Sequence, residues 1–157
     1  MYFAYVNSRI LYMSSLWSSA PKYILESVDI LQRKALRIVF MKDFRCSRRE
    51  LYSEDILPAT ISAEIHSVIL IFKMLNNMII NNVTFTFLNQ IHSHATRNVN
   101  NFIVPFCNTQ FGCNNFYIRA LRNYNNLPIE IKKINSLSIF KRSIKEFMYD
   151  SIVMSDV

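Results

Sequence analysis

The spacing of apolar and polar residues predicts five helices along the 157 residues of this chain. In residues 22–41, apolar side chains recur every three or four positions, as they do along one face of a helix. Pro21 suits the first turn of this helix, and Ser18 and Ser19 are candidates for its cap. The predicted apolar stripe consists of Ile24, Val28, Leu31, Ala35 and Ile38.

Two further helices are predicted on either side of Pro58. Ser47 and Glu50 have the spacing of a capping box, which would open a short helix over residues 47–56. Residues 61–80 follow and are apolar on nearly every side. Because a helix that is apolar all round must be buried, we expect this segment to form the central helix of the core.

The C-terminal half of the chain predicts an irregular segment followed by two helices. Residues 81–115 are rich in Asn and lack helical periodicity, and a short strand is predicted over residues 101–104. Helices are predicted over residues 115–123 and 136–149. The whole pattern predicts one all-α domain over residues 1–157, an irregular multi-helix fold with an Asn-rich irregular middle segment. The apolar face predicted for the last helix consists of Leu137, Phe140, Ile144, Phe147 and Met148.

Positive charge is concentrated in two blocks of the sequence. The chain carries 18 Lys and Arg residues against 11 Asp and Glu residues, for a net charge of +7. Residues 22–49 hold eight bases and three acids, and residues 119–145 hold seven bases and one acid. This arrangement favours a polyanionic partner, and we expect RNA or DNA, bound without sequence preference through its phosphates.

Most bases of these blocks are predicted nucleic-acid contacts. In the first block, Lys22 with Glu26 and Asp29 with Arg33 have the spacing of ion pairs along a helix. An ordinary solvated helix face is therefore the alternative interpretation of that block. The predicted contacts are Arg33, Lys34, Arg37, Lys42, Arg45, Arg48 and Arg49 in the first block, and Lys132, Lys133, Lys141, Arg142 and Lys145 in the second.

Composition also excludes several functional classes. With Gly112 as its single glycine, the chain cannot contain a dinucleotide-binding GxGxxG turn or a P-loop. Its three cysteines are too few and too scattered for a disulfide framework. The N-terminus lacks a basic region like that of a signal peptide, and the most apolar run, residues 68–72, is too short to cross a bilayer. We therefore expect an intracellular protein with no membrane partner.

Neither a catalytic nor a metal site is predicted. Glu54 and Asp55 form the one adjacent acidic pair, whereas two-metal catalysis needs several carboxylates close together. No thiol near His66, His92 or His94 is marked as a nucleophile. The possible zinc ligands His92, His94, Cys107 and Cys113 do not have the usual finger spacing, so we interpret them as loop histidines and thiols and expect no cofactor.

A series of short phrases resembles the segment that follows the polymerase domain in reverse transcriptases of jockey-like non-LTR retrotransposons. The resemblance covers residues 10–149, and the order and spacing of the phrases carry it. The phrases are LQRKALRIV at 31–39, ELY at 50–52, ILP at 56–58, FKMLN at 72–76, HSHATR at 92–97, YNNLPIEI at 124–131 and FKRSIK at 140–145.

The resemblance implies a fragment of a larger enzyme. In that family the catalytic aspartate pair and the endonuclease lie upstream of this segment, so the resemblance implies no catalytic residue here. It implies a non-catalytic, helical segment that contributes nucleic-acid binding or docks on the polymerase domain of an RNA-directed DNA polymerase. His94 stands where the family commonly has an aromatic residue. The start at Met1, close to the segment boundary, suggests a truncated copy of a transposable element. The alternatives are a helical protein-interaction module and a non-functional retroelement remnant.

Overall fold

The computed structural model describes residues 1–53, 55–80, 82–91 and 100–155. These residues are mostly helical and include no β-strand, which confirms the predicted all-α fold class. None of the described helices is both long enough and apolar enough to span a bilayer. The elements are η1 (Phe3–Asn7), α1 (Ser8–Leu11), α2 (Ser14–Trp17), α3 (Lys22–Val39), α4 (Arg48–Leu51), α5 (Ala59–Leu75), η2 (Leu88–Gln90), α6 (Gln110–Cys113), α7 (Phe116–Asn125), α8 (Ile129–Lys132) and α9 (Leu137–Ser155).

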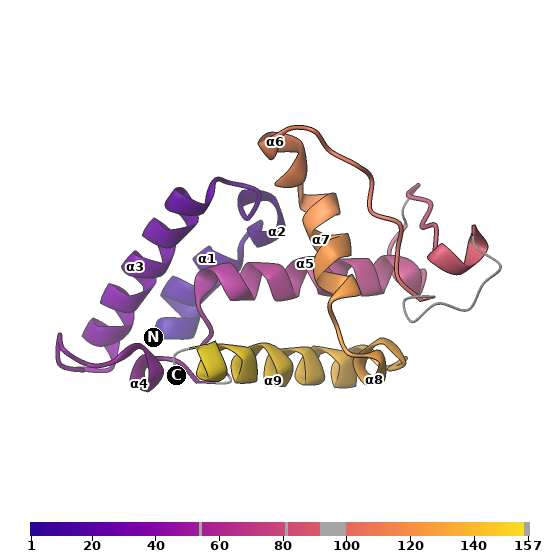
Figure 1. Ribbon diagram of the computed structural model, residues 1–157. Coiled ribbons are helices and arrows are strands. Elements are labelled where there is room, and N and C mark those ends of the chain that lie inside the picture. Colours follow the sequence, from indigo (N-terminus) through magenta and orange to yellow (C-terminus); the bar gives the residue numbers. More distant parts are fainter. Residues whose placement is uncertain (54, 81, 92–99, 156–157) are drawn as a thin grey trace.

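Helix α5 forms the centre of the main core. Helix α9 runs antiparallel beneath it, and α7 crosses it (Figure 1). The ring of Phe72 on α5 stacks on the ring of Phe140 on α9, with 4.1 Å between their centroids. The prediction that this helix lies at the centre of the core is confirmed. The side chains that α5 buries include Ile65, Val68, Ile71 and Phe72.

The N-terminal elements and α3 build a second, smaller core. Leu36 of α3 is fully buried there, beside Tyr2 at the start of the chain. Leu51 of α4 and Tyr52 complete the cluster. Because this cluster shares no buried residue with the main core, the position of α3 depends on how it is attached to α5.

Helix α3 turns a different face to the core from the one that its apolar periodicity predicts. Ile24, Leu31 and Ile38 of the predicted stripe are 42%, 64% and 78% exposed. Each buried residue lies one position after a residue of that stripe, which is a rotation of about 100° around the helix. The prediction of the buried face was therefore wrong. The buried residues of α3 are Leu25, Asp29, Gln32 and Leu36.

Gln32 explains part of this rotation. Its side-chain Nε2 donates to the Tyr2 hydroxyl at 2.7 Å and to the Leu57 carbonyl at 2.9 Å. Its Oε1 accepts a hydrogen bond from the Ala59 N–H at 2.7 Å. A polar side chain can be buried when its hydrogen bonds are made inside the protein, and all three of these partners lie far from Gln32 in the sequence.

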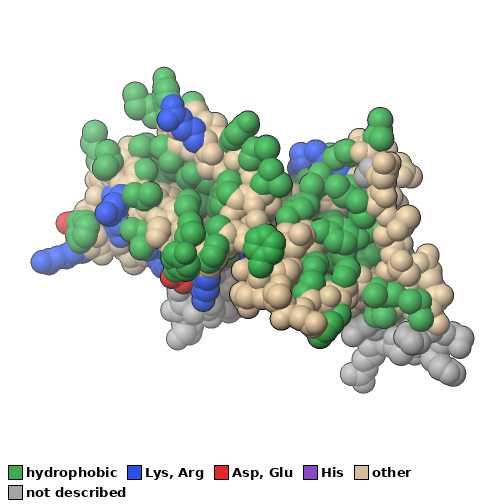
Figure 2. Space-filling view, turned by 90° about the horizontal axis from the view of Figure 1, so that it is seen from above, with side chains coloured by type: hydrophobic (Ala, Val, Ile, Leu, Met, Phe, Trp, Pro, Cys, Tyr) green, Lys and Arg blue, Asp and Glu red, His purple; other side chains and the backbone are tan. Residues whose placement is uncertain are grey.

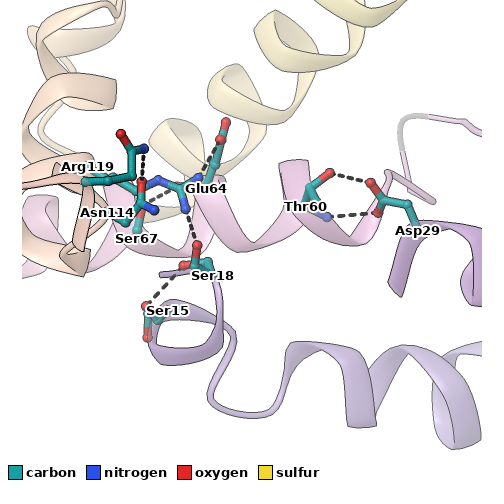
Figure 3. A network of polar contacts seen from close by, with 9 residues as sticks. Ser15, Ser18, Asp29, Thr60, Glu64, Ser67, Asn114 and Arg119 are labelled. Carbon is teal, nitrogen blue, oxygen red and sulfur yellow. Dashed lines mark hydrogen bonds and ion pairs between the residues drawn. The ribbon is translucent and has the colours of Figure 1, made fainter. Parts of the chain in front are cut away.

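Asp29 contributes the second attachment of α3 to α5 (Figure 3). Its carboxylate accepts hydrogen bonds from the Thr60 N–H at 3.1 Å and from the Thr60 hydroxyl at 2.7 Å. The ion pair predicted between Asp29 and Arg33 does not form, because the carboxylate points into the protein. The pair predicted between Lys22 and Glu26 does form, at 3.9 Å on the surface.

The ends of the predicted helices differ from the observed ones. Ser47 caps α4 as predicted, but this helix ends at Leu51 instead of continuing to residue 56. Ser53 and Ile56 then pair through two backbone hydrogen bonds of 3.1 and 2.9 Å, which turn the chain toward α5. At the far end of α5, Asn77 adopts a left-handed conformation with φ of 52°, and the helix stops short of the predicted residue 80.

The described part of the Asn-rich middle is irregular but attached to the core. Instead of the predicted strand, Phe102 makes an isolated antiparallel bridge with Phe87. The side-chain amide of Asn125 on α7 pairs with the backbone of Phe102, accepting from its N–H at 2.8 Å and donating to its carbonyl at 3.0 Å. The Phe102 ring is buried against those of Phe87 and Tyr124.

Arg119 joins three helices at the other end of the core (Figure 3). Its guanidinium, on α7, pairs with Glu64 of α5 at 3.1 Å and also donates to the carbonyl of Ser18 after α2. The hydroxyls of Ser18 and Ser19 bond to backbone carbonyls of the preceding turn. Neither serine caps α3, so the predicted cap was wrong. The residue at the cap position is Pro21.

Candidate nucleic-acid interface

The loop between α3 and α4 carries the end of the first basic block. Met41 adopts a left-handed conformation with φ of 50°, and the Lys42 N–H donates to the Arg37 carbonyl at 2.9 Å. These features end the helix and reverse the chain. The Asp43 carboxylate then accepts from the Arg45 N–H at 2.8 Å. The loop therefore has a defined shape, and its one acid is hydrogen-bonded to its own backbone.

A hydrogen-bonded cap also engages the acid of α4. The Ser47 hydroxyl accepts from the Glu50 N–H at 3.4 Å and donates to the Glu50 carboxylate at 2.9 Å. The Cys46 thiol donates to the same carboxylate at 3.1 Å. Hydrogen bonds from Cys46 and then Ser47 lower the pKa of Glu50, and the bond to Glu50 raises the pKa of the Cys46 thiol.

Two predicted contacts of the first block support the loop. Arg37 donates to the Cys46 carbonyl at 3.3 Å, and its guanidinium carbon lies 5.5 Å from the centre of the Phe44 ring. The Nε atom of Arg37 is buried and has no hydrogen-bond partner in the described part of the chain. Arg33 is half-buried beside Tyr52. Because Arg33 and Arg37 are half-buried and contact the protein, their guanidinium groups are less accessible to a ligand than the exposed bases around them.

The other five predicted contacts of the first block are open to solvent. All of them are exposed, and within the residues that the structure describes none forms an ion pair. They lie along the C-terminal half of α3, its following loop and α4. A surface of this kind can contact successive phosphates, because each cation is free to exchange water for a phosphate oxygen. The residues are Lys34, Lys42, Arg45, Arg48 and Arg49.

The second block does not form a single surface. Lys132 on α8 donates to the Asn125 carbonyl at 2.7 Å and to the Asn101 side chain at 3.0 Å, and its Nζ lies 5.9 Å from the centre of the Tyr124 ring. Burial lowers the pKa of Lys132. This lysine therefore holds α8 against the middle segment, while the neighbouring Lys133 is exposed.

The remaining predicted contacts of the second block lie on α9. Arg142 is exposed and pairs with Glu146 one turn later, at 2.8 Å. Lys141 and Lys145 are exposed and form no ion pair with any described residue. Both lysines line a cleft of about 540 Å³ between α5 and α9, which also holds the imidazole of His66.

Sequence reasoning did not predict His66, which lines this cleft, or Lys73, which lines a smaller cleft beside it, as parts of a binding site. His66 and Lys73 lie seven positions apart on α5, which places them on one face of a helix that is otherwise almost entirely apolar. A second cleft, of about 380 Å³, joins Lys73 and His66 to Lys141. Two polar residues at helical spacing within an apolar helix were the signal, but only the packing of α9 shows that they meet the second basic block.

His66 is held in place by a serine. Its Nδ1 is 3.0 Å from the hydroxyl of Ser14 on α2, and Ser14 is buried. Burial lowers the pKa of His66, and the positive charges of Lys141, Lys145 and Lys73 lower it further. The imidazole is therefore mainly neutral at pH 7 and surrounded by cations.

The candidate catalytic and zinc residues are described only in part. Glu54, His92 and His94 lie outside the described residues. The Cys113 thiol lies 3.7 Å from the Cys107 carbonyl, so the two cysteines are close together around α6. Within the described residues, no three His, Cys, Asp or Glu side chains gather as ligands for one metal ion.

Comparison with known proteins adds no relative to this description. No protein-family model, no curated protein and no solved structure matches the chain.

Proposed function

We propose that this protein binds RNA or DNA through phosphate contacts, without sequence preference, as a non-catalytic helical segment of a retrotransposon reverse transcriptase. One observation carries the proposal: the five exposed predicted contacts from Lys34 to Arg49 have no carboxylate partners among the described residues, whereas the acids between them, Asp43 and Glu50, bond to their own turns. An uncompensated row of cations favours phosphate binding.

Two further features support the proposal. Lys141 and Lys145 add a second basic surface on α9, beside the cleft that contains His66. The phrases that resemble the post-polymerase segment of jockey-like elements indicate an enzyme that handles template RNA and nicked DNA. The same resemblance places the polymerase and endonuclease residues upstream, so we expect the isolated chain to extend no primer and to cut no nucleic acid. It also suggests that the protein acts in the nucleus.

The test is the salt dependence of binding. Fluorescence anisotropy with labelled duplex DNA and single-stranded RNA, over a range of salt concentrations, gives the slope of log affinity against log salt. The variant carries Arg45→Gln, Arg48→Gln and Arg49→Gln. If all three side chains contact phosphate, the slope should become shallower by about 0.9 per residue on duplex DNA and about 0.7 on a single strand.

A control variant with the same change of net charge completes the experiment. It carries Arg9→Gln, Lys22→Gln and Arg122→Gln, three exposed positions outside the predicted surface. Its slope should stay close to that of the wild type. Equal losses in both variants would mean that net charge alone governs binding. No binding even at low salt would overturn the proposed function.

A second candidate function, docking of another protein domain, is favoured by the exposed apolar stripe of α3. Ile24, Leu31 and Ile38 lie in solvent, and hydrophobic side chains are widespread on the face shown in Figure 2, where Lys and Arg are few. Extended exposed apolar surface commonly marks a protein interface. The polymerase domain of a related element is the partner that the resemblance suggests. Leu31→Gln with Ile38→Gln, which leaves the net charge unchanged, should abolish binding to that purified domain and leave nucleic-acid binding intact. Unchanged domain binding would reject this role.

A further inference from the structure

A small basic recess lies between α2, α5 and α9. It has a volume of about 380 Å³ and opens next to the larger cleft between α5 and α9, with which it shares His66, Ile69 and Lys141. Its polar lining consists of cations and hydrogen-bond donors only. These side chains are Ser14, Ser15, His66, Lys73 and Lys141.

The lysines around the recess are not neutralised. Lys73, Lys141 and Lys145 form no ion pair with any described residue. The acids nearby, Asp55 and Glu146, line only the larger outer cleft, and Glu146 pairs with Arg142 at 2.8 Å. The inner recess is therefore a place where cations converge with no anion of the protein to balance them. Such a place attracts a negatively charged ligand.

His66 gives the recess a group that can change its charge. Its Nδ1 is hydrogen-bonded to the Ser14 hydroxyl, which fixes the ring. In the tautomer whose Nδ1–H donates to the Ser14 hydroxyl, Nε2 carries no proton and has no hydrogen-bond partner among the described residues, so this atom can take up a proton and donate it to a ligand. Ser14 is itself buried, and α2, which carries it, packs on α5.

The geometry points to a phosphate-binding pocket in which His66 becomes protonated when the phosphate enters. Lys73 and Lys141 supply compact positive charges, with Lys145 in the adjoining cleft, and the serine hydroxyls and imidazole supply directed donors. This combination suits the tetrahedral oxyanion of a phosphate. The inference rests on the proposed function for the source of that phosphate, which is either a diester of a nucleic-acid backbone or the terminal monoester of a strand.

Proton uptake follows from the charges that face His66. On α9 these are Lys141 and Lys145, with the neutralised pair of Arg142 and Glu146 farther out. The remaining charges are Lys73 on α5 and Asp55 before it, and α1 and α2 line the recess with no charged side chain. A phosphate among these lysines would reverse the local potential and so favour the imidazolium. By linkage, protonation of His66 must then strengthen phosphate binding by the same factor.

The test uses inorganic sulfate as a probe of the whole chain. Sulfate has the shape of phosphate, and its charge stays constant across the pH range in which histidine titrates. The pKa of His66 is measured from its imidazole NMR signal, which the His66→Gln variant identifies. We expect saturating sulfate to raise this pKa by about one unit, equivalent to about tenfold tighter sulfate binding below the pKa of His66 than above it.

Two controls separate binding from screening. Chloride at the same ionic strength screens the lysines equally, so a rise of equal size in chloride would overturn the inference. The variant with Lys73→Gln and Lys141→Gln should lose the sulfate effect, and the variant with Lys22→Gln and Arg122→Gln, which has the same net charge, should keep it. Circular dichroism checks that both variants fold. An undiminished sulfate effect in the first variant would also overturn the inference.

Oligonucleotides then identify the source of the phosphate and separate the two proposals. The same strand is added with and without a 5′-phosphate. A rise in the His66 pKa with both strands supports a backbone diester, and a rise that needs the 5′-phosphate supports a terminal monoester. If the strands bind but neither strands nor sulfate move the pKa of His66, the pocket is rejected while the proposed function stands. If sulfate alone moves it and no strand binds, the pocket stands and the proposed function falls.

Discussion

The carboxylate of Asp29, on α3, caps the first turn of α5 by accepting two hydrogen bonds from Thr60. The bonds are 3.1 Å long from the backbone N–H and 2.7 Å long from the hydroxyl. A helix N-terminus has unsatisfied N–H groups and a partial positive charge, so a carboxylate at this place both satisfies a donor and stabilises the helix dipole. Asp29, which caps this turn of α5, therefore lies 31 positions before Thr60 in the chain.

Replacing this cap should destabilise the whole protein. We expect Asp29→Ala to lower the free energy of unfolding by about 1 to 3 kcal/mol, because Thr60 loses both acceptors in a half-buried place. Urea unfolding followed by circular dichroism measures the change. Glu26→Ala is the matched control, since Glu26 lies one turn earlier in an exposed pair and should change stability by less than about 1 kcal/mol. Equal effects at the two positions would contradict the capping role.

The rotated face of α3 predicts opposite outcomes for two leucines. Leu36 is fully buried, so Leu36→Ala should lower the free energy of unfolding by about 2 to 5 kcal/mol. Leu31 is 64% exposed, and Leu31→Ala should change it by no more than about 0.5 kcal/mol. Chemical denaturation of the two variants compares them directly. A larger loss at Leu31 would restore the face that the apolar periodicity predicts.

Tyr52 should govern part of the stability at alkaline pH. Burial, and then the Asp29 carboxylate, raises the pKa of Tyr52 to about 12 from the ordinary value of 10.0. Because the unfolded chain loses this proton first, stability that is present below pH 10 should be lost as the pH rises toward 12. The shift is worth about 2 to 3 kcal/mol. Tyr52→Phe should flatten this part of the pH profile of unfolding.

The same variant should cost little near neutral pH. The Tyr52 hydroxyl is buried beside Arg33 without a well-formed hydrogen bond to any described residue. Burying a hydroxyl without a hydrogen bond costs desolvation free energy that no partner offsets. Because replacing the hydroxyl by hydrogen removes this cost, stability at pH 7 should be unchanged or higher by up to about 1 kcal/mol. A loss above that size would mean that the hydroxyl has a partner in solution. Tyr124→Phe provides a comparison at another buried tyrosine with a raised pKa.

Metal removal should leave the fold unchanged. We expect the purified protein to contain less than one equivalent of zinc, and chelators to leave its far-UV circular dichroism as it was. The observation behind this expectation is the spacing of His92, His94, Cys107 and Cys113 in the sequence. Helicity that falls with chelator and returns with zinc would show that these residues form a structural site.

The local pattern of the sequence predicted the elements that depend mainly on neighbouring residues. Ser47 caps α4 with Glu50, α7 forms close to the predicted residues 115–123, and the apolar segment around Val68 forms the central helix. Caps and helix periodicity involve residues three or four positions apart, so both signals can be read from a short stretch of chain. The exposed bases of the first block were also predicted from their positions, since long charged side chains without local partners seldom enter a core.

Tertiary structure alone decided the orientation of α3 and which residues line the cleft between α5 and α9. Periodicity shows which residues share a helix face, but the face that is buried depends on what the neighbouring helices offer. Here Gln32 and Asp29 find hydrogen-bond partners around the start of α5, which offsets the cost of burying them and leaves Leu31 in solvent. His66 and Lys141 meet for the same reason: the antiparallel packing of α5 and α9 brings together residues that no local pattern connects.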